Sequence, residues 1–374
     1  MEKAAVIIIG GGPAGLTAAI HLARNMVDPV VFEKEEYPHH KVCGEYLSRE
    51  VLPYLQQLGV PLEDLVPAKN ISRMLFSTPS GKSVEADLAL GGIGISRYAL
   101  DYLLYKKAKD LGVRVIQASV TRVAYKNDGF EVSTARGAYT SDHVLGAFGK
   151  RSGLDKYLDR PFFKKPAPWL AVKAHYSNDG FPEDLVALHN FRGGYCGLSR
   201  TETGNINVCY LANYNSFKAH KDPETFRTEV LQENPFLKDF FSHSSPLFDQ
   251  PLTIAQVSFE DKASVKDHIL MLGDAAGLLH PLCGNGMAMA IQSARIASGL
   301  VIKALKDTSI SRTQIEVEYA RQWNLSFRSR IRTGRLLQKV LLNQQLSEFS
   351  QQLISAFPFL LPQIIKRTHG QPLS

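Results

Sequence analysis

The sequence has few cysteines and no long apolar run, and both absences narrow its function. Its 374 residues include only four dispersed cysteines and no Cys-x-x-Cys pair; they are Cys43, Cys196, Cys209 and Cys283. This scatter argues against a zinc or iron–sulfur site and favours free thiols in a cytoplasmic protein. No uninterrupted apolar stretch approaches the roughly 20 residues that span a bilayer, and no basic leader precedes the first strand. We therefore expect neither a membrane span nor a signal peptide.

Net charge is scarce outside one segment. The formal net charge is +7, yet residues 319–347 hold six basic and no acidic residues, which leaves 7 − 6 = +1 for the rest. Basic and aromatic residues do not interleave as nucleic-acid binding would require, so we expect no nucleic-acid partner. The basic, leucine-containing region 311–374 predicts helices. They would pack over their own domain or touch an anionic membrane at its inner face.

An apolar strand and a glycine turn open the chain. Residues 4–9 are uncharged and β-branched, as in a strand buried on both faces. Gly10-Gly11-Gly12-Pro13-Ala14-Gly15 then fits G-x-G-x-x-G and leads into a helical pattern. Gly10 allows the tight turn, Gly12 the approach of a pyrophosphate, and Gly15 the packing of helix on strand. The pattern predicts a dinucleotide site at the N-terminus of this helix.

A second apolar run strengthens this interpretation. It covers residues 29–32 and ends in Glu33, eighteen positions after Gly15 (33 − 15 = 18). An acidic residue at this distance hydrogen-bonds the adenosine ribose hydroxyls. The Glu33 carboxylate would repel a 2′-phosphate there.

Later segments differ in texture. Residues 161–261 alternate like antiparallel strands with one exposed face, interrupted by a single helix near 223–233. We expect this second sheet to form the roof of a substrate cavity. A hairpin turn at 200–204 would place Cys196 opposite Val208, leaving Cys209 on the other face and the two thiols unbonded.

Three blocks in order carry a resemblance to a known superfamily. They are the opening glycine turn with Glu33, the run 144–149 before Arg151-Ser152, and Gly273-Asp274-Ala275-Ala276 followed by Pro281 and Gly284-Asn285-Gly286. The chain thus resembles the FAD-dependent monooxygenase and geranylgeranyl-reductase superfamily.

The resemblance implies an α/β fold with a Rossmann-like, parallel-sheet FAD-binding domain at 1–160 and 262–310. A small β region near 70–95 would be inserted in it. An antiparallel-sheet substrate domain would cover 161–261, and a helical C-terminal region 311–374.

The resemblance also implies site residues. Asp274 would accept a hydrogen bond from a ribityl hydroxyl, Arg97 would approach the pyrophosphate, and Val120 would offer backbone groups to adenine. The helix starting at Gly286 would direct its N-terminus to the flavin N1–C2=O edge. The expected cofactor-binding residues are Gly10, Gly12, Pro13, Ala14, Gly15, Glu33, Lys34, Cys43, Gly44, Arg97, Val120, Gly149, Gly273, Asp274, Pro281, Gly284, Asn285, Gly286 and Met287.

Cys43 is the one catalytic candidate. Its segment, residues 41–44, resembles the loop in the reductase branch where a cysteine approaches the isoalloxazine and substrate; the alternative is a small buried thiol that supports the loop. His280 is an acid–base candidate or a structural histidine. His39-His40 lacks a third ligand at useful spacing, so we expect no metal.

Phe148 departs from the aromatic-hydroxylase pattern, which has an Asp-Gly pair here that serves both FAD and NAD(P)H. A phenyl ring cannot accept those hydrogen bonds, which leaves NAD(P)H as electron donor open and suggests a redox partner.

We interpret the chain as an FAD-dependent oxidoreductase, and first as a monooxygenase that hydroxylates a bulky lipophilic or aromatic substrate. The alternatives are a geranylgeranyl-reductase-like enzyme that saturates C=C bonds of a prenyl lipid, an electron-transfer-type flavoprotein dehydrogenase, and a flavin-binding protein without turnover.

Overall fold

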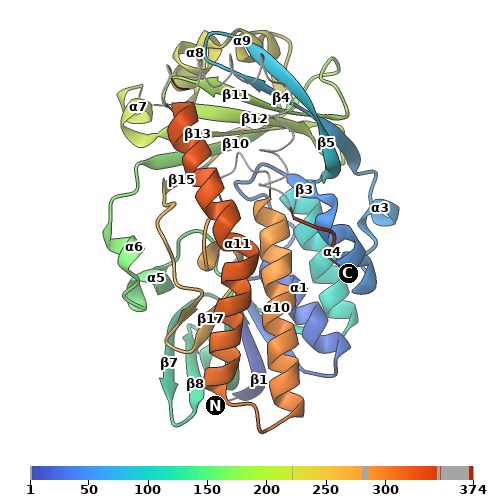
Figure 1. The fold of residues 1–374 in the computed structure, drawn as a ribbon, viewed down its shortest axis with the longest axis vertical. Helices are drawn as coiled ribbons and strands as arrows, with labels where there is room; N and C mark the ends of the chain where they lie inside the picture. Colours follow the sequence, from blue (N-terminus) through green and yellow to red (C-terminus); the bar gives the residue numbers. More distant parts are fainter. Residues whose placement is uncertain (1, 221, 280–284, 343–345, 347–369, 374) are drawn as a thin grey trace.

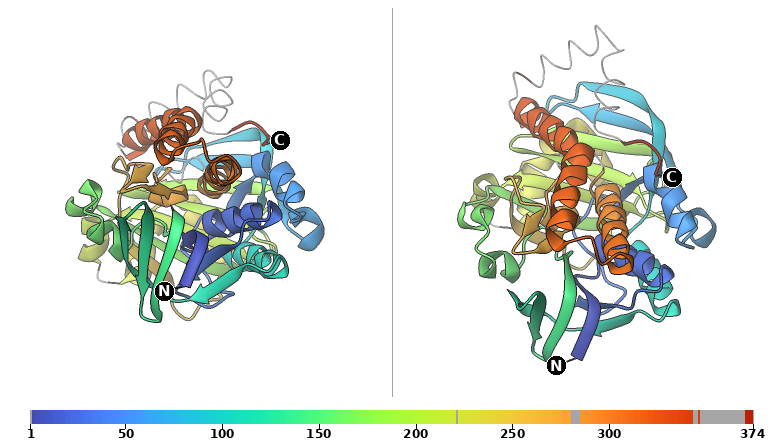
Figure 2. Two further views of the ribbon diagram at one scale, coloured as in Figure 1. Left: turned by 90° about the horizontal axis from the view of Figure 1, so that it is seen from below. Right: turned by 60° about the horizontal axis from the view of Figure 1, so that its bottom comes forward.

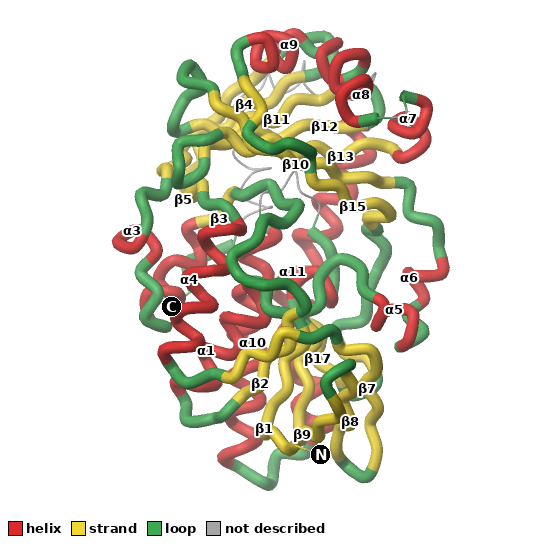
Figure 3. The backbone as a smooth tube through the Cα atoms, turned by 180° about the vertical axis from the view of Figure 1, so that it is seen from behind, coloured by secondary structure: helices red, strands yellow, loops and turns green. Residues whose placement is uncertain are grey.

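Two β-sheets with helices around them form the protein. A computed structural model describes residues 2–220, 222–279, 285–342, 346 and 370–373. Figures 1 and 3 show sheet A at the end that carries the N-terminus and sheet B at the opposite end. The predicted α/β fold, with a parallel nucleotide-binding sheet and a second sheet, is confirmed.

Sheet A is the nucleotide-binding sheet. Strands β17, β9, β1, β2 and β6 are parallel neighbours in that order. Val6, Ile7 and Ile8 of β1 are fully buried, which is why this central strand has no polar face. In the described residues its strands are β1 (Glu2–Ile9), β2 (Pro29–Glu33), β6 (Arg114–Gln117), β7 (Val120–Lys126), β8 (Gly129–Thr134), β9 (Gly137–Gly146), β16 (Val265–Lys266) and β17 (Ile269–Met271).

Long helices cover sheet A. The helix α10 packs against α1 and α11, and α10 and α11 lie side by side in both views of Figure 2. By length and composition alone α10 could cross a membrane, but 56% of its apolar window is buried inside the protein. The helices outside residues 214–242 are α1 (Pro13–Arg24), α2 (Leu52–Gln57), α3 (Leu62–Leu65), α4 (Arg97–Asp110), α5 (Gly153–Tyr157), α6 (Pro161–Lys164), α10 (Gly286–Lys306) and α11 (Arg312–Leu342), with 3₁₀ turns η1 (Arg49–Val51) and η3 (Gly273–Ala275).

Sheet B is larger than the sequence indicates. Residues 69–94, expected as an insertion in the first domain, extend it, because β4 pairs in parallel with β11. The two strands are about 110 residues apart in the chain, and pairing at such a distance leaves no local signal. Its strands are β3 (Tyr46–Ser48), β4 (Lys69–Ser77), β5 (Ser83–Gly94), β10 (Trp169–Ser177), β11 (Leu185–Phe191), β12 (Gly194–Arg200), β13 (Ile206–Asn213), β14 (Ser245–Pro246) and β15 (Leu252–Val257).

The β12–β13 hairpin keeps its two cysteines apart. Cys196 lies opposite Tyr210 and Cys209 opposite Gly197, so the expected pairing of Cys196 with Val208 is wrong by two residues. The thiols still lie on opposite faces of the sheet, and Cys43, Cys196 and Cys209 are free.

Helices also cover the outer face of sheet B. The expectation of a single helix near 223–233 is wrong, because residues 214–242 form α7 (Tyr214–Ala219), α8 (Pro223–Glu229), η2 (Leu231–Glu233) and α9 (Pro235–Ser242). Asn234 caps α9 through its side chain, and proline follows it at the first helical position, so the chain restarts as a new helix.

A buried histidine beneath these helices makes stability depend on pH. The His189 ring accepts or donates one hydrogen bond with Ser77 Oγ at 2.8 Å, and burial lowers its pKa to about 4. The unfolded chain, with the ordinary value of 6.5, therefore takes up this proton first. The stabilisation is complete above pH 6.5 and is lost as the pH falls through 4. His189→Gln should reduce the change in unfolding free energy between pH 7 and pH 5 by about 2 kcal/mol.

Chemical denaturation at the two pH values measures this. His243→Gln is the control, because His243 is exposed beside Asp239 and should leave the pH dependence unchanged. Equal pH dependence in wild type and His189→Gln would contradict the assignment.

The described end of the chain lies against the body. Leu373 is buried, and its N–H donates to the Glu50 carbonyl at 2.7 Å. The Arg330 guanidinium of α11 reaches the buried Glu50 carboxylate at 3.3 Å. Part of the basic segment therefore packs on its own domain, and contact of the rest with a membrane stays a prediction.

Candidate active site

The turn from β1 to α1 brings backbone atoms into contact. A Cβ built on Gly15 would lie 1.9 Å from the Gly10 carbonyl oxygen, so α1 can start this close to β1 only with glycine. Gly10 has a φ of 105°, and its N–H donates to the Phe32 carbonyl at 2.8 Å. Gly12 is the N-cap, and Pro13 and Ala14 begin α1 in the core. No side chain caps this helix, which leaves first-turn N–H groups for an anion.

Glu33 lies at the carboxyl end of β2, beside this turn. Its buried carboxylate accepts hydrogen bonds from the Gly11 N–H at 2.7 Å and the Glu35 N–H at 3.2 Å, and Lys41 Nζ lies 3.6 Å away. Burial alone would raise the pKa of this carboxyl, but Lys41 and the backbone donors hold it below its ordinary value. Glu33 is thus ionised where the ribose was expected. Lys34 instead pairs with Glu35 at the surface.

Arg97 links several expected site residues. It begins α4, where the Ser96 hydroxyl accepts the Ala99 N–H, and its guanidinium binds both oxygens of Asp101 at 2.7 and 2.5 Å. Burial opposes its charge, but Asp101 holds the pKa of Arg97 above its ordinary value. The guanidinium lies 3.1 Å from where a Cβ of Gly12 would be, within electrostatic reach of Cys43 and Asp274.

Lys262 joins the two later blocks. Its ammonium donates to the carbonyls of Lys150 at 2.7 Å and Asp274 at 2.8 Å, so the loop around Gly149 is fixed to the turn at Gly273. Burial lowers the pKa of Lys262 to about 8. The Gly273 N–H donates to Ser293 Oγ of α10 at 2.9 Å, which fixes this turn in place.

The start of α10 meets these blocks. Asn285 is its buried N-cap, Gly286 its first residue, and Met287 packs in the core. Pro281 and Gly284, with His280 and Cys283, lie outside the described residues. Val120 begins β7, just after Ala118, whose N–H donates to the Glu33 carbonyl at 2.9 Å, so Val120 lies near the expected ribose site.

Sheet B holds the segment that contains Cys43. The Asn207 amide donates to the Cys43 carbonyl at 3.2 Å, and the Ser199 hydroxyl donates to the Gly44 carbonyl at 3.3 Å. Both donors lie on the face of sheet B that is turned toward this segment. Cys43 is half-buried, and the loop that carries it is fixed by side-chain donors rather than left as a free connection.

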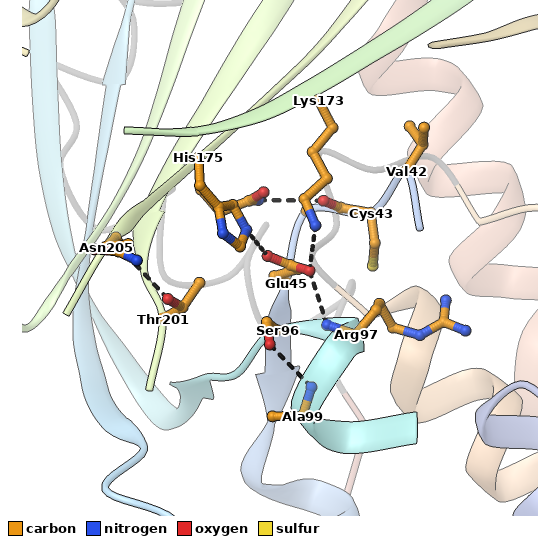
Figure 4. Close-up of polar contacts among 12 residues, drawn as sticks. Val42, Cys43, Glu45, Ser96, Arg97, Ala99, Lys173, His175, Thr201 and Asn205 are labelled. Atoms are coloured by element: carbon orange, nitrogen blue, oxygen red, sulfur yellow. Dashed lines mark hydrogen bonds and ion pairs between the residues drawn. The ribbon is translucent and has the colours of Figure 1, made fainter. Parts of the chain in front are cut away.

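A buried ion cluster lies next in the chain (Figure 4). Glu45 Oε1 accepts from Lys173 Nζ at 2.5 Å and from the Arg97 N–H at 2.8 Å, and Oε2 lies 2.7 Å from His175 Nε2. Glu45 and Lys173 are fully buried. Burial alone would raise the pKa of Glu45, but the hydrogen bonds from His175 and Lys173 hold it below its ordinary value. Glu45 is therefore a fixed carboxylate between a lysine and a histidine.

His40 lies at the outer side of this cluster. Its ring centroid is 5.1 Å from that of His175 and 4.8 Å from that of Phe248, and its Nδ1 is buried with no hydrogen-bond partner among the described residues. Burial and the charge of Lys173 lower the pKa of His40 to about 4, so it is neutral at pH 7.

A metal ion is a poor occupant of this cluster. Ligand atoms of His40, Glu45 and His175 lie within 4.8 Å of one another, which the sequence did not reveal. Lys173 already occupies Glu45 and would repel a divalent cation, so we interpret the group as a hydrogen-bonded cluster.

The face of sheet B turned toward the Cys43 segment has two halves, set by strand register. Lys173 lies beside Cys209, and His175 beside Asn207. Two residues earlier on β10, Ala171 lies beside Leu211 and Tyr195 in an apolar cluster that also includes Leu188 and Leu278, with Val42, Trp169 and Phe259 packed against it. An apolar half therefore adjoins the ion cluster at Lys173.

A family model described as "FAD binding domain" matches residues 3–312 of this chain. The chain belongs to the FAD-binding domain family. FAD is therefore its cofactor, and the chain is an FAD-dependent oxidoreductase.

Curated relatives of this FAD-binding chain are distant. It is 24% identical to conditioned medium factor receptor 1 of Dictyostelium discoideum, covering 86% of this chain and 68% of that protein. It is 24% identical to digeranylgeranylglycerophospholipid reductase of Methanocaldococcus jannaschii (85% and 81% covered), and 23% identical to menaquinone reductase of Mycobacterium tuberculosis (80% and 77%).

Solved structures share the fold. The flavin-dependent brominase Bmp2 aligns with a TM-score of 0.78 at 18% identity, covering 98% of this chain and 93% of its own. A geranylgeranyl bacteriochlorophyll reductase-like protein from Thermoplasma acidophilum aligns with a TM-score of 0.74 at 20% identity, covering 91% and 88%.

The residues present fit FAD. The backbone contact of Gly15 with Gly10 and the ionised Glu33 suit its adenosine diphosphate half. A Cβ built on Gly44, Gly149 or Gly286 meets nothing within 4 Å, so there is open space beside the backbone of all three blocks. The individual FAD contacts stay predictions.

Glu45, Lys173 and His175 are the candidates that the sequence analysis missed. Lys173 and His175 alternate with apolar residues inside the strand sequence Trp169–Ser177, and a lysine within such a strand is a signal that could have found them.

Proposed function

We propose that this chain is an FAD-dependent reductase that saturates C=C bonds of a long apolar, prenyl-type substrate. The observation that carries the proposal is the two-part face of sheet B, where an apolar cluster ends at a buried lysine on a fixed carboxylate. An isoprenoid chain needs the first half, and reduction of its double bond needs the second.

The balance of the reaction explains why. Reduced FAD, when bound, supplies a hydride to one alkene carbon and is itself reoxidised. The other carbon then takes a proton, and this chain holds one at Lys173 Nζ, the group of the cluster nearest the apolar half in strand register. Glu45 stays ionised and fixes the ammonium, while His175 on its other oxygen and His40 beyond lead toward the less buried side.

The names of relatives support this choice. The archaeal and mycobacterial relatives are reductases of a digeranylgeranyl phospholipid and of menaquinone, which are prenylated compounds. The hydroxylation favoured by the sequence remains the alternative; the shared fold with a brominase agrees with either chemistry.

Anaerobic single turnover tests the proposal. Photoreduced holoenzyme mixed with menaquinone or a geranylgeranyl lipid should reoxidise its flavin and give a product heavier by two hydrogens, one of them deuterium in D2O. Photoreduction avoids reliance on NAD(P)H, since Phe148 stands where the hydroxylase branch has aspartate. No alkene loss without oxygen, with an oxygen atom added to the product once O2 is admitted, would overturn the reductase in favour of the monooxygenase.

A further inference from the structure

A cavity of about 330 Å³ lies between α11 and the segment before β16. Arg328, Arg332 and Arg335 line it from α11, at the i, i+4 and i+7 spacing that places side chains on one helix face. Lys262 lines it from the opposite side. Four cations therefore surround one space.

The acidic residues of the cavity do not neutralise these cations. Glu260 pairs with Lys165 at 2.6 Å, outside the cavity lining, and Asp261 pairs with Arg335 at 2.8 Å. Arg328 and Arg332 are exposed and have no ion pair or hydrogen bond within the part of the chain that the structure describes. Two guanidinium groups are thus available to an anion, and guanidinium donors match phosphate geometry.

The cavity wall is rigid. Trp323 and Ile331 of α11 pack on Gly277, where a built Cβ would lie 3.4 and 3.2 Å from them. Lys262 holds the Asp274 and Lys150 carbonyls, so the cavity shares a wall with the flavin blocks.

The cavity also adjoins the apolar half of sheet B. Two of its lining residues, Glu260 and Gly277, are the direct chain neighbours of Phe259 and Leu278, which belong to the apolar cluster. A molecule with an anion in the cavity can therefore place its apolar chain along that cluster.

We propose that this cavity binds the phosphate headgroup of the substrate, so that the substrate is an anionic prenyl phosphate or phospholipid. The assignment rests on the proposed reductase function and adds its headgroup specificity. Arg328 and Arg332 bind the phosphate, Arg335 and Lys262 contribute positive potential, and the headgroup fixes which double bond reaches the flavin.

Fluorescence of Trp323 tests the site directly. The chain has two tryptophans, so Trp169→Phe holoenzyme leaves Trp323, in the cavity wall, as the reporter. Geranylgeranyl phosphate should change its emission. R328Q/R332Q in that background should weaken binding of geranylgeranyl phosphate at least tenfold, and that of neutral geranylgeraniol less than twofold. R321Q is the matched control, because Arg321 pairs with Glu318 on the same helix and does not line the cavity.

Three outcomes would overturn the headgroup site. They are unchanged affinity in R328Q/R332Q, an equal loss in R321Q, and inorganic phosphate binding as tightly as geranylgeranyl phosphate. If R328Q/R332Q still saturates neutral menaquinone like wild type but binds geranylgeranyl phosphate unchanged, the reductase stands and the headgroup site fails. If geranylgeranyl phosphate needs both arginines but no prenyl compound is ever saturated, the site stands and the proposed function fails.

Discussion

Lys173→Met should lower single-turnover saturation of a prenyl substrate by at least about 100-fold while the protein stays yellow, because a positioned proton donor contributes about 10²–10⁴-fold. Methionine fills a similar volume on β10 but holds no proton, and Lys173 lies in sheet B rather than in the nucleotide-binding sheet. Rapid mixing of photoreduced enzyme with substrate measures the rate, and released FAD measures cofactor content.

Stability must be separated from chemistry in this variant. Loss of the ammonium leaves the Glu45 carboxylate fully buried with His175 and one backbone N–H, which costs roughly 3–5 kcal/mol. The double variant Lys173→Met/Glu45→Gln removes both charges and should regain most of that stability without regaining the rate.

Lys69→Met is the surface control, because Lys69 pairs with the exposed Glu183 and should change neither quantity. A double variant that recovers wild-type turnover would show that the pair only stabilises the fold. Unchanged turnover in Lys173→Met would remove the proton-donor assignment.

The nucleotide-binding half was predictable because its determinants are local. The β1–α1 turn requires glycine where Gly15 meets the Gly10 carbonyl, and a requirement of this kind is written in consecutive residues. Arg97 was found for a similar reason, since the Ser96 cap marks the start of its helix.

The ion cluster was not predictable from spacing. Glu45 lies 128 residues from Lys173 and 130 from His175, and only the β10 register together with the fixed 43–45 segment brings them together. The sequence analysis found no convincing acid–base group, although the alternation of Lys173 and His175 in an apolar strand was visible. Sheet B was underestimated for the same reason, because the β4–β11 pairing is equally non-local.

The shift in the β12–β13 hairpin has a local cause. The Thr201 N–H donates to the Asn205 carbonyl at 2.8 Å and the Gly204 N–H to the Thr201 carbonyl at 3.0 Å, which closes the turn one residue later than assumed. A shift of one in the turn moves each partner by two, so faces are preserved and partners are not. The face argument about the cysteines therefore survived the wrong register.

Gly15→Ala should yield protein that purifies almost colourless. The new Cβ would lie 1.9 Å from the Gly10 carbonyl oxygen, a backbone atom that cannot rotate away, so α1 must move off β1. Movement of α1 separates its first-turn N–H groups from Glu33 and from the Arg97 guanidinium beside Gly12, so phosphate and ribose contacts are lost together. Losing two charge-assisted contacts of about 1.5–3 kcal/mol each corresponds to at least a hundred-fold weaker affinity for FAD.

Gly153→Ala is the matched control for this loss. Gly153 is also the first residue of a helix, α5, but a Cβ there meets nothing within 4 Å, so Gly153→Ala should bind FAD like wild type. Titration of apoprotein with FAD, followed by quenching of flavin fluorescence, gives both affinities. Circular dichroism checks that Gly15→Ala keeps its helices, since the clash is confined to one turn. Wild-type affinity in Gly15→Ala would show that the close approach of α1 to β1 does not form the phosphate site, and the cofactor would then have to be held chiefly by the later blocks around Gly149, Asp274 and Gly286.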